Sequence, residues 1–424
     1  MIFATLLFLL VIAAIPYGTV EPWWKAAFVC AVFAICIPAI IDTSSFKVVH
    51  GSILLPMLAL TALAFFQTLS FGSQEVAGIT IRNTISADPF QTRFFVLQML
   101  ALAAWLALLY RYANTESRMR VLVYTILGVA VVSAIFGILR QATQHQTGFV
   151  LPLLRPTQGY GQFINKNHFA YLMEMAFGLT IGVALTTGMK RERLLIYLAL
   201  LLPIWTALVL SNSRGGILAM LVQIVSAALL LTSRRQATVL RAALLVVLVA
   251  GVLFGTLWAG GDRLASNFEN ATSEFNTGET NARAGVSRNE IWRATLKMFA
   301  AHPITGVGLG GYWIGITAYH DASGLMTPQE AHNDYLELLS SGGLVGFAIG
   351  VWFVVMVIRV GRANLASDTG YTRALRFGAI LGIIGVAAHS LVDFGLHILV
   401  NAIIFLALIM IATARSPQKG TSGT

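Results

Sequence analysis

The chain has 424 residues, of which 57% are hydrophobic and only 11% are charged, and its formal net charge is +10. A soluble globular protein carries about 25% charged residues, so the composition excludes an ordinary soluble protein and indicates an integral membrane protein. The apolar runs are long and unbroken, as transmembrane helices of ~20 residues require. A membrane β-barrel would instead show short segments of alternating hydrophobicity.

The apolar runs predict an all-α integral membrane protein with about 12 transmembrane helices in a single polytopic domain, residues 1–424. Between spans 9 and 10, residues 260–332 are predicted to form a large extracytoplasmic loop. The predicted spans are 2–20, 25–42, 49–68, 93–111, 121–141, 166–187, 193–211, 215–232, 240–259, 333–359, 374–393 and 396–414.

The positions of Lys and Arg predict the orientation of the chain, because cytoplasmic loops of membrane proteins are enriched in these residues. With the N-terminus in the cytoplasm, more than half of the 28 basic residues but few of the 18 acidic residues fall on the cytoplasmic side. Both termini are therefore predicted to be cytoplasmic. The positive net charge reflects this topology, and we expect no binding of nucleic acid.

Two groups of polar residues stand at the outer ends of the middle spans. Asn165, Lys166 and Asn167 lie at the start of the span at 166–187, where they either cap a helix or line a path for a substrate. Arg214 lies in the short bend of "LVLSNSRGGILAML", residues 208–221, between two apolar runs. A charge at this depth is a candidate functional group, and the alternative is an arginine that extends to the lipid headgroups.

The outer segment contains "SRNEIWRATLKMFAAHPITGVGLGGYW", residues 287–313. Ser287 followed by Glu290 matches a capping box and predicts a short amphipathic helix with Ile291, Leu296 and Met298 on its apolar face. This helix brings Arg288, Arg293 and Lys297 to the outer surface, as binding residues or as a solvated face. The following "GVGLGG" follows no strand, so it predicts a tight loop rather than a dinucleotide-binding turn.

The next apolar span opens on "PQEAHNDYLELLSSGG", residues 328–343. His332 is expected at or just before the helix start, with Asn333 or Asp334 as the cap. A neutral imidazole that faces two arginines can accept a proton while the guanidinium groups hold an anion. Glu330, His332 and Asp334 alternate along the chain, which would spread them apart, so we expect no metal site.

These motifs together resemble the O-antigen ligase and polymerase superfamily. "HNDYLELLSSGG" resembles the histidine signature of that superfamily, and "GQFINKNHFAYL", residues 161–172, resembles its pattern at the start of a middle span. "SNSRGG" resembles the arginine hairpin that follows, and "SRNEIW…HPITGVGLGGY" resembles the segment of the large external loop. The resemblance covers residues from about 155 to 410.

The resemblance implies a helical glycosyltransferase of the C type in the bacterial inner membrane, with its active site facing the periplasm. An O-antigen ligase moves a glycan from undecaprenyl diphosphate to lipid A-core without a metal or other cofactor. Arg214 and Arg288 match the arginines assigned to the diphosphate, and His332 matches the histidine assigned as the base. The candidate substrate-binding residues are Asn165, Lys166, Asn167, Arg293 and Asn333.

Two alternatives remain open at this stage. An O-antigen or exopolysaccharide polymerase of the same superfamily has a glycan as its acceptor and shares these motifs. A transporter of lipid-linked glycans would instead show broken helices or repeats around a site at the membrane midplane. The polar residues of this chain gather at the outer edge, which favours an enzyme.

Overall fold

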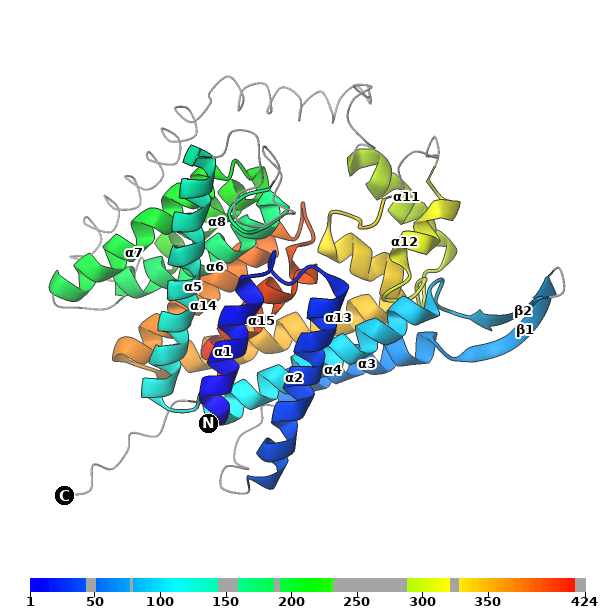
Figure 1. The fold of residues 1–424 in the computed structure, drawn as a ribbon, viewed down its shortest axis with the longest axis horizontal. Coiled ribbons are helices and arrows are strands. Elements are labelled where there is room, and N and C mark those ends of the chain that lie inside the picture. The colour runs from blue at the N-terminus through cyan, green and yellow to red at the C-terminus, as the bar shows by residue number, and fades with distance from the viewer. Residues whose placement is uncertain are drawn as a thin grey trace.

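The structure is a computed structural model of the chain that describes residues 1–42, 51–76, 79–143, 159–186, 191–231, 288–320 and 328–415. These residues are predominantly helical (Figure 1). The predicted span at 240–259 lies outside the described residues. Residues 260–287, the first part of the predicted outer loop, also lie outside them.

A helix occupies each of the other eleven ranges predicted as spans. By length and composition, six of the described helices can cross a membrane, namely α2, α4, α5, α6, α13 and α14, and the other five contain shorter apolar stretches. The described part is thus that of a multi-pass helical membrane protein, and the number of 12 spans stays a prediction. The eleven helices are α1 (Ile2–Ala14), α2 (Pro22–Ile41), α3 (Gly51–Gln67), α4 (Pro89–Tyr112), α5 (Glu116–Thr143), α6 (Lys166–Thr186), α7 (Arg191–Leu210), α8 (Arg214–Leu231), α13 (Asp334–Ser367), α14 (Gly370–His389) and α15 (Leu399–Thr413).

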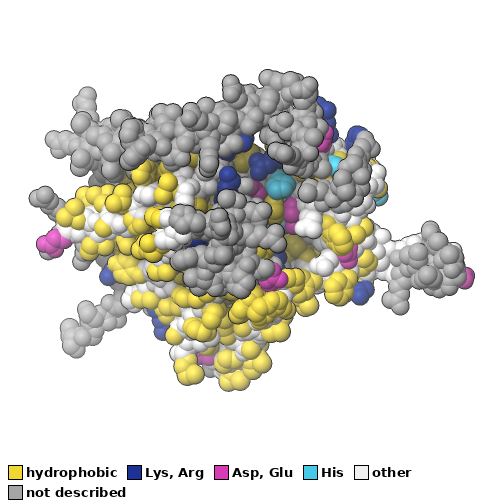
Figure 2. Space-filling view, turned by 45° about the horizontal axis from the view of Figure 1, so that its top comes forward, with side chains coloured by type: hydrophobic (Ala, Val, Ile, Leu, Met, Phe, Trp, Pro, Cys, Tyr) yellow, Lys and Arg dark blue, Asp and Glu magenta, His cyan; other side chains and the backbone are white. Residues whose placement is uncertain are grey.

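The outer surface of the bundle is strongly apolar. Large hydrophobic side chains such as Phe8, Trp23 and Ile40 are exposed on this surface. In Figure 2 hydrophobic side chains cover much of the lower part of the face, whereas basic and histidine side chains gather in its upper centre. Extended apolar surface of this kind is rare on a soluble monomer and is the surface that a bilayer covers.

Helix α6 forms the centre of the bundle and packs closely against α14. Gly178 and Gly182 of α6 face Gly382 and Gly378 of α14. A Cβ atom at Gly178, Gly182 or Gly378 would collide with the backbone of the opposite helix, and one at Gly382 would lie 3.2 Å from the carbonyl oxygen of Met175 in α6. Each helix thus carries two glycines four positions apart at this contact, the spacing that allows two membrane helices to approach closely. This contact fixes the ends of α6 and α14, which both border the site described below.

Helix α13 is interrupted at Gly343, whose φ of 63° is outside the helical range. The freed amides of Leu344 and Val345 donate to the carbonyl oxygens of Pro303 and Ile304, at 2.8 and 3.2 Å. In return the amides of residues 307 and 308 donate to the carbonyl oxygens of residues 340 and 341. The glycine-rich segment is thus a tight loop in close backbone contact, as predicted, and it attaches residues 288–320 to the bundle.

The predicted amphipathic helix is present as α11 (Arg288–Ala301). Ile291 and Met298 are buried as expected, but Leu296 is 48% exposed, so its placement on the apolar face was wrong. Leu296 lies five positions from Ile291, and that spacing turns it away from the buried side. Ser287 lies outside the described residues, so the capping box stays a prediction. The buried side of α11 packs on the segment formed by α12 (Tyr312–Gly315) and the short helix η2 (Ile316–Ala318).

One element was not predicted from the sequence. Strands β1 (Ser70–Val76) and β2 (Ile79–Thr84) pair antiparallel and extend away from the bundle at the end of α3 (Figure 1). Their residues are largely polar and form no apolar run, so a search for transmembrane helices gives no signal there.

Candidate functional site

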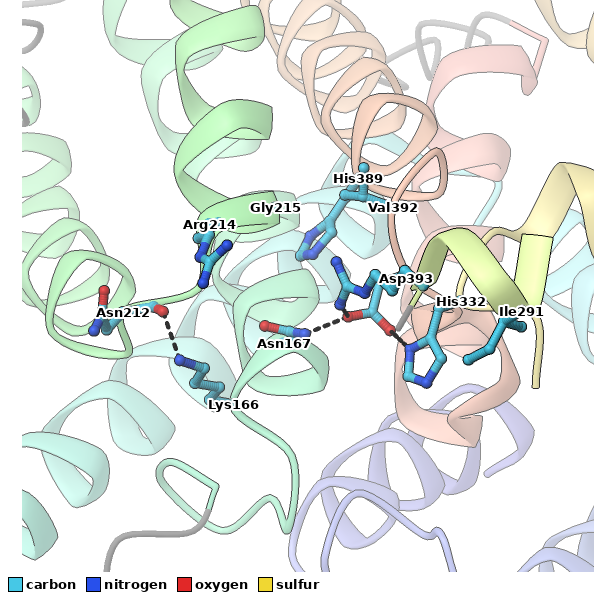
Figure 3. A pocket seen from close by; sticks show the side chains of 11 residues that line it. Lys166, Asn167, Asn212, Arg214, Gly215, Ile291, His332, His389, Val392 and Asp393 are labelled. Carbon is cyan, nitrogen blue, oxygen red and sulfur yellow. Dashed lines mark hydrogen bonds and ion pairs between the residues drawn. The ribbon is translucent and has the colours of Figure 1, made fainter. Parts of the chain in front are cut away.

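A cleft of about 340 Å³ opens where five separate segments of the chain meet (Figure 3). Its size lies within the range of small-molecule sites, roughly 300–1,000 Å³. It is bordered by the start of α6, the turn before α8, the start of α11, the residue that precedes the cap of α13, and the end of α14 with the loop that follows. The lining residues are Lys166, Asn167, Asn212, Arg214, Gly215, Arg288, Ile291, His332, His389, Val392 and Asp393.

Arg214 is the first residue of α8 and borders the cleft. The hydroxyl of Ser213 caps this helix by accepting from the amide of Gly216 at 3.2 Å. Within the described residues, the guanidinium group of Arg214 has no acidic partner within ion-pair distance. A free guanidinium at a helix N-terminus, where unpaired amides carry partial positive charge, favours the binding of an anion.

The turn before α8 is held against the start of α6. Lys166 donates from Nζ to the carbonyl oxygen of Asn212 at 2.9 Å, and Asn167 accepts from the Ser213 hydroxyl at 2.9 Å. Asn212 has a φ of 53°, a conformation that asparagine tolerates better than most residues. Asn165 accepts from the amide of Asn167 at 2.8 Å. Lys166 and Asn167 thus line the cleft, whereas Asn165 caps the start of α6.

His332 borders the cleft from the opposite side. Its φ of 51° is left-handed, which costs on the order of 1–3 kcal/mol for a non-glycine residue. Asn333 provides the cap of α13, because its side chain accepts from the amides of Tyr335 and Leu336 at 3.0 Å. Its amide group also donates to the carbonyl oxygen of Leu391 at 2.8 Å. The sequence predicts Asn333 or Asp334 as the cap of α13, and this role is confirmed for Asn333. The cap connects the segment that carries His332 to the loop after α14.

Asp393, which was not predicted from the sequence, joins the two sides of the cleft. Its carboxylate is 1% exposed and lies 3.6 Å from a guanidinium nitrogen of Arg288 and 3.6 Å from Nδ1 of His332. The side chain of Asn167 donates to the same carboxylate, as does the amide of Phe394 at 2.9 Å. Burial alone would raise the pKa of Asp393, but His332, Arg288 and the other donors around it hold that pKa below its usual range. Asp393 is therefore ionised at neutral pH.

The contact between Asp393 and His332 determines which ring nitrogen of the imidazole faces the carboxylate. A distance of 3.6 Å is longer than a hydrogen bond, although such contacts in a site without substrate often tighten when the substrate binds. With Nδ1 turned to a carboxylate, Nε2 is the nitrogen available to accept a proton. Phe394 packs edge-on against the same ring, with centroids 4.8 Å apart.

The other carboxylates near His332 face away from the cleft. Glu330, Asp334 and Glu337 surround His397, with carboxylate oxygens 3.2, 3.5 and 3.7 Å from its ring nitrogens. Burial opposes a charge on His397, but these carboxylates raise its pKa to about 10. Burial would likewise raise the pKa of Glu330, but the attraction of His397 outweighs it, and the pKa of Glu330 falls to about 2. Glu330 and Asp334, which flank His332 in the sequence, are thus paired with His397 instead. Together with Glu337 they form a network of ion pairs around that histidine.

Ligand atoms of Glu330, Glu337 and His397 lie within 4.8 Å of one another, a spacing that would also suit a cation. None of the three lines the cleft. The absence of a metal from the reaction therefore stays a prediction.

The structure thus brings five of the predicted site residues into one cleft, namely Lys166, Asn167, Arg214, Arg288 and His332. Asn165 and Asn333 cap the helices that carry neighbouring residues, and Arg293 is exposed and does not line the cleft. Asp393 and His389 were missed because both stand at the end of an apolar run that was assigned as a span. The signal in the sequence for them was the pair of ionisable residues at the end of that run.

A family model described as O-antigen ligase matches residues 196–351 of the chain. This segment contains Arg214, Arg288 and His332 and three of the four motifs on which the resemblance rests, so the resemblance is confirmed there. The motif at residues 161–172 lies outside the matched segment. The match supports a membrane protein with glycosyltransferase-like ligase or polymerase activity. No curated protein matches the chain.

Proposed function

We propose that this protein, whose central segment matches the O-antigen ligase family model, is an O-antigen ligase. It transfers a glycan from undecaprenyl diphosphate to lipid A-core on the periplasmic face of the inner membrane. The observation that carries the proposal is the composition of one cleft. Arg214, which has no acidic partner among the described residues, and His332, which is oriented by a carboxylate, line the same space. That pairing suits a reaction with an anionic leaving group and a hydroxyl nucleophile.

In the proposed reaction, the acceptor hydroxyl attacks the anomeric carbon of the lipid-linked sugar. The bond between this carbon and the diphosphate oxygen breaks, and undecaprenyl diphosphate departs with the bonding electron pair. Nε2 of His332 takes the proton of the hydroxyl, and Asp393 stabilises the imidazolium that forms. Arg214 and Arg288 stabilise the diphosphate as its charge develops. No step requires a metal ion or cofactor.

Arg288 has a second contact that bears on this role. Its guanidinium group lies near Asp393 and is 44% exposed, so part of it remains available to a phosphate. Arg214 has the larger share of the proposed anion binding because it has no competing carboxylate among the described residues. Arg288, at the start of α11, is therefore connected to the proposed base His332 through the carboxylate of Asp393.

A deletion strain tests the proposal and separates it from the polymerase alternative. Loss of a ligase should leave free lipid A-core and an accumulation of long glycans on the polyprenyl carrier. Acceptor lipids that carry single repeats would instead indicate a polymerase, and an unchanged glycan profile would contradict both. Complementation with Arg214→Lys should restore little ligation, because lysine lacks the planar group that binds a phosphate through two nitrogens.

A further inference from the structure

A second histidine lines the cleft from the end of α14. The side chain of His389 is fully buried, and its Nδ1 lies 2.8 Å from a carboxylate oxygen of Glu174 in α6, which is also fully buried. The ring of Tyr171 stacks on the imidazole, with centroids 4.1 Å apart. Figure 3 shows the ring of His389 among the other residues of the cleft, beside Gly215.

The remaining ring nitrogen of His389 is not satisfied. Nε2 is buried and has no hydrogen-bond partner among the residues that the structure describes. Gly215 lies directly against it, and a Cβ atom at that position would collide with the ring. A buried polar atom without a partner is costly, and here the atom belongs to a residue that borders a cleft.

The net charge of the pair formed by His389 and Glu174 determines whether Nε2 carries a hydrogen or a lone pair. An imidazolium beside an ionised Glu174 has no net charge, and a neutral imidazole beside a protonated Glu174 has none either. Both states place a hydrogen on Nε2 when Nδ1 shares the proton with the facing oxygen of Glu174. A lone pair on Nε2 would require either a pair with one proton fewer, which would carry a net negative charge in a fully buried position, or a proton on Oε1 of Glu174, which is buried and has no partner among the described residues. Both alternatives are unfavourable.

We propose that His389, oriented by Glu174, donates a hydrogen bond through Nε2 to the phosphate oxygens of a polyprenyl diphosphate. This inference rests on the proposed function, because it assigns a further contact to the same donor. His389 would bind the diphosphate from the inner wall of the cleft, with Arg214 and Arg288 contributing from other sides. The contact would strengthen as the leaving diphosphate gains charge, with no transfer of a proton from His389.

The test is a binding measurement on the full-length chain purified in detergent, with farnesyl diphosphate as the probe. Isothermal titration calorimetry would compare the wild type with His389→Phe, which keeps an aromatic ring but has no donor. Loss of a hydrogen bond to a charged group should weaken binding by about tenfold to a hundredfold. His389→Gln should recover part of the affinity, because its amide can still donate.

Gln223→Leu provides the matched control. Gln223 is fully buried and bridges the same two helices, donating to the carbonyl oxygens of Glu174 and Leu381 at 2.8 and 3.1 Å. It does not line the cleft. This variant should lose thermal stability but bind farnesyl diphosphate as the wild type does.

Equal affinity of the wild type and folded His389→Phe would overturn the inference and leave His389 as a structural link between α6 and α14. A wild type that fails to bind farnesyl diphosphate would overturn the proposed donor as well. If His389→Phe does not remain monodisperse, nitrogen-15 histidine NMR of the wild type provides the second measurement. The ring signal that disappears in His389→Gln should shift when farnesyl diphosphate is added, and an unchanged signal would contradict the inference.

Discussion

Asp393 contacts both kinds of group that the proposed reaction needs, since it lies 3.6 Å from Arg288 and 3.6 Å from His332. Such a carboxylate keeps the imidazole in one orientation and stabilises it when it gains a proton. Its proposed role is therefore one of positioning, in which it acts through His332 and not on the substrate.

Replacement of Asp393 should consequently resemble replacement of the base. His332→Ala should lower kcat by about 10²–10⁴-fold, the usual contribution of general-base catalysis. Asp393→Asn should lower kcat strongly with a smaller effect on KM. Residues that act as a unit give non-additive losses, so the double variant should be little worse than His332→Ala alone. Losses that multiply in steady-state transfer assays would show that the two residues act separately.

The network around His397 predicts a dependence of stability on pH. The pKa of His397 is raised to about 10 in the folded protein, compared with roughly 6.5 for an unperturbed histidine. Its stabilising contribution is fully present below pH ~6.5 and is lost as the pH rises toward 10. The effect should be modest because the side chain is 37% exposed and solvent screens the charges.

Thermal unfolding in detergent between pH 6 and pH 10 measures this contribution. The melting temperature of the wild type should fall across that range, and His397→Gln should reduce the slope. His302→Gln is the control, since His302 is exposed and lies in no ion pair among the described residues. An identical slope in the wild type and in His397→Gln would contradict the assignment.

The residue types of the site could be predicted better than their partners. Arg214, Arg288 and His332 stand out because charged residues are rare in this chain and lie beside apolar runs or in a polar loop. Asp393 lies far from His332 in sequence, and only the folded bundle brings the two together. Hydropathy reports which residues avoid lipid, but it does not report which of them meet.

At the scale of elements, the close contact between α6 and α14 makes a distinct prediction. Gly182 faces Gly378 without space for a side chain, so Gly182→Leu would force the two helices apart. Overpacking of this kind costs about 1–3 kcal/mol and should lower the melting temperature in detergent. Gly128→Leu is the matched control, because a Cβ atom at Gly128 of α5 meets no other atom within 4 Å. Equal melting temperatures for the two variants would contradict the observed packing.

The helices followed from the sequence because a segment that crosses a bilayer must satisfy its own backbone hydrogen bonds and must be apolar over a sufficient length. The break at Gly343 and the hairpin of β1 and β2 did not follow from it. The break depends on backbone hydrogen bonds exchanged with residues 303–308, which come from a different part of the chain. The hairpin is short and largely polar, so it lacks the signal that identified the helices.

At the scale of the whole molecule, the distribution of basic residues predicts that α11 and η2 lie outside the cytoplasm. In a variant without Cys30 and Cys36, Thr317→Cys should react with an impermeant maleimide in intact spheroplasts. Ser117→Cys, on the opposite side in the predicted topology, should react only after lysis. Both positions are exposed in the structure. The reverse pattern would place the cleft in the cytoplasm and contradict a periplasmic ligase.

The reaction proposed for this cleft is the transfer of a glycan from a polyprenyl diphosphate to lipid A-core without a metal. The most direct test combines the purified full-length protein with an undecaprenyl-diphosphate-linked glycan and lipid A-core in the presence of EDTA, and follows the product by gel electrophoresis and mass spectrometry. We predict that lipid A-core gains the glycan in EDTA and that His332→Ala abolishes most of this product. Activity that is lost in EDTA and restored by a divalent ion, or undiminished turnover in His332→Ala, would contradict the account.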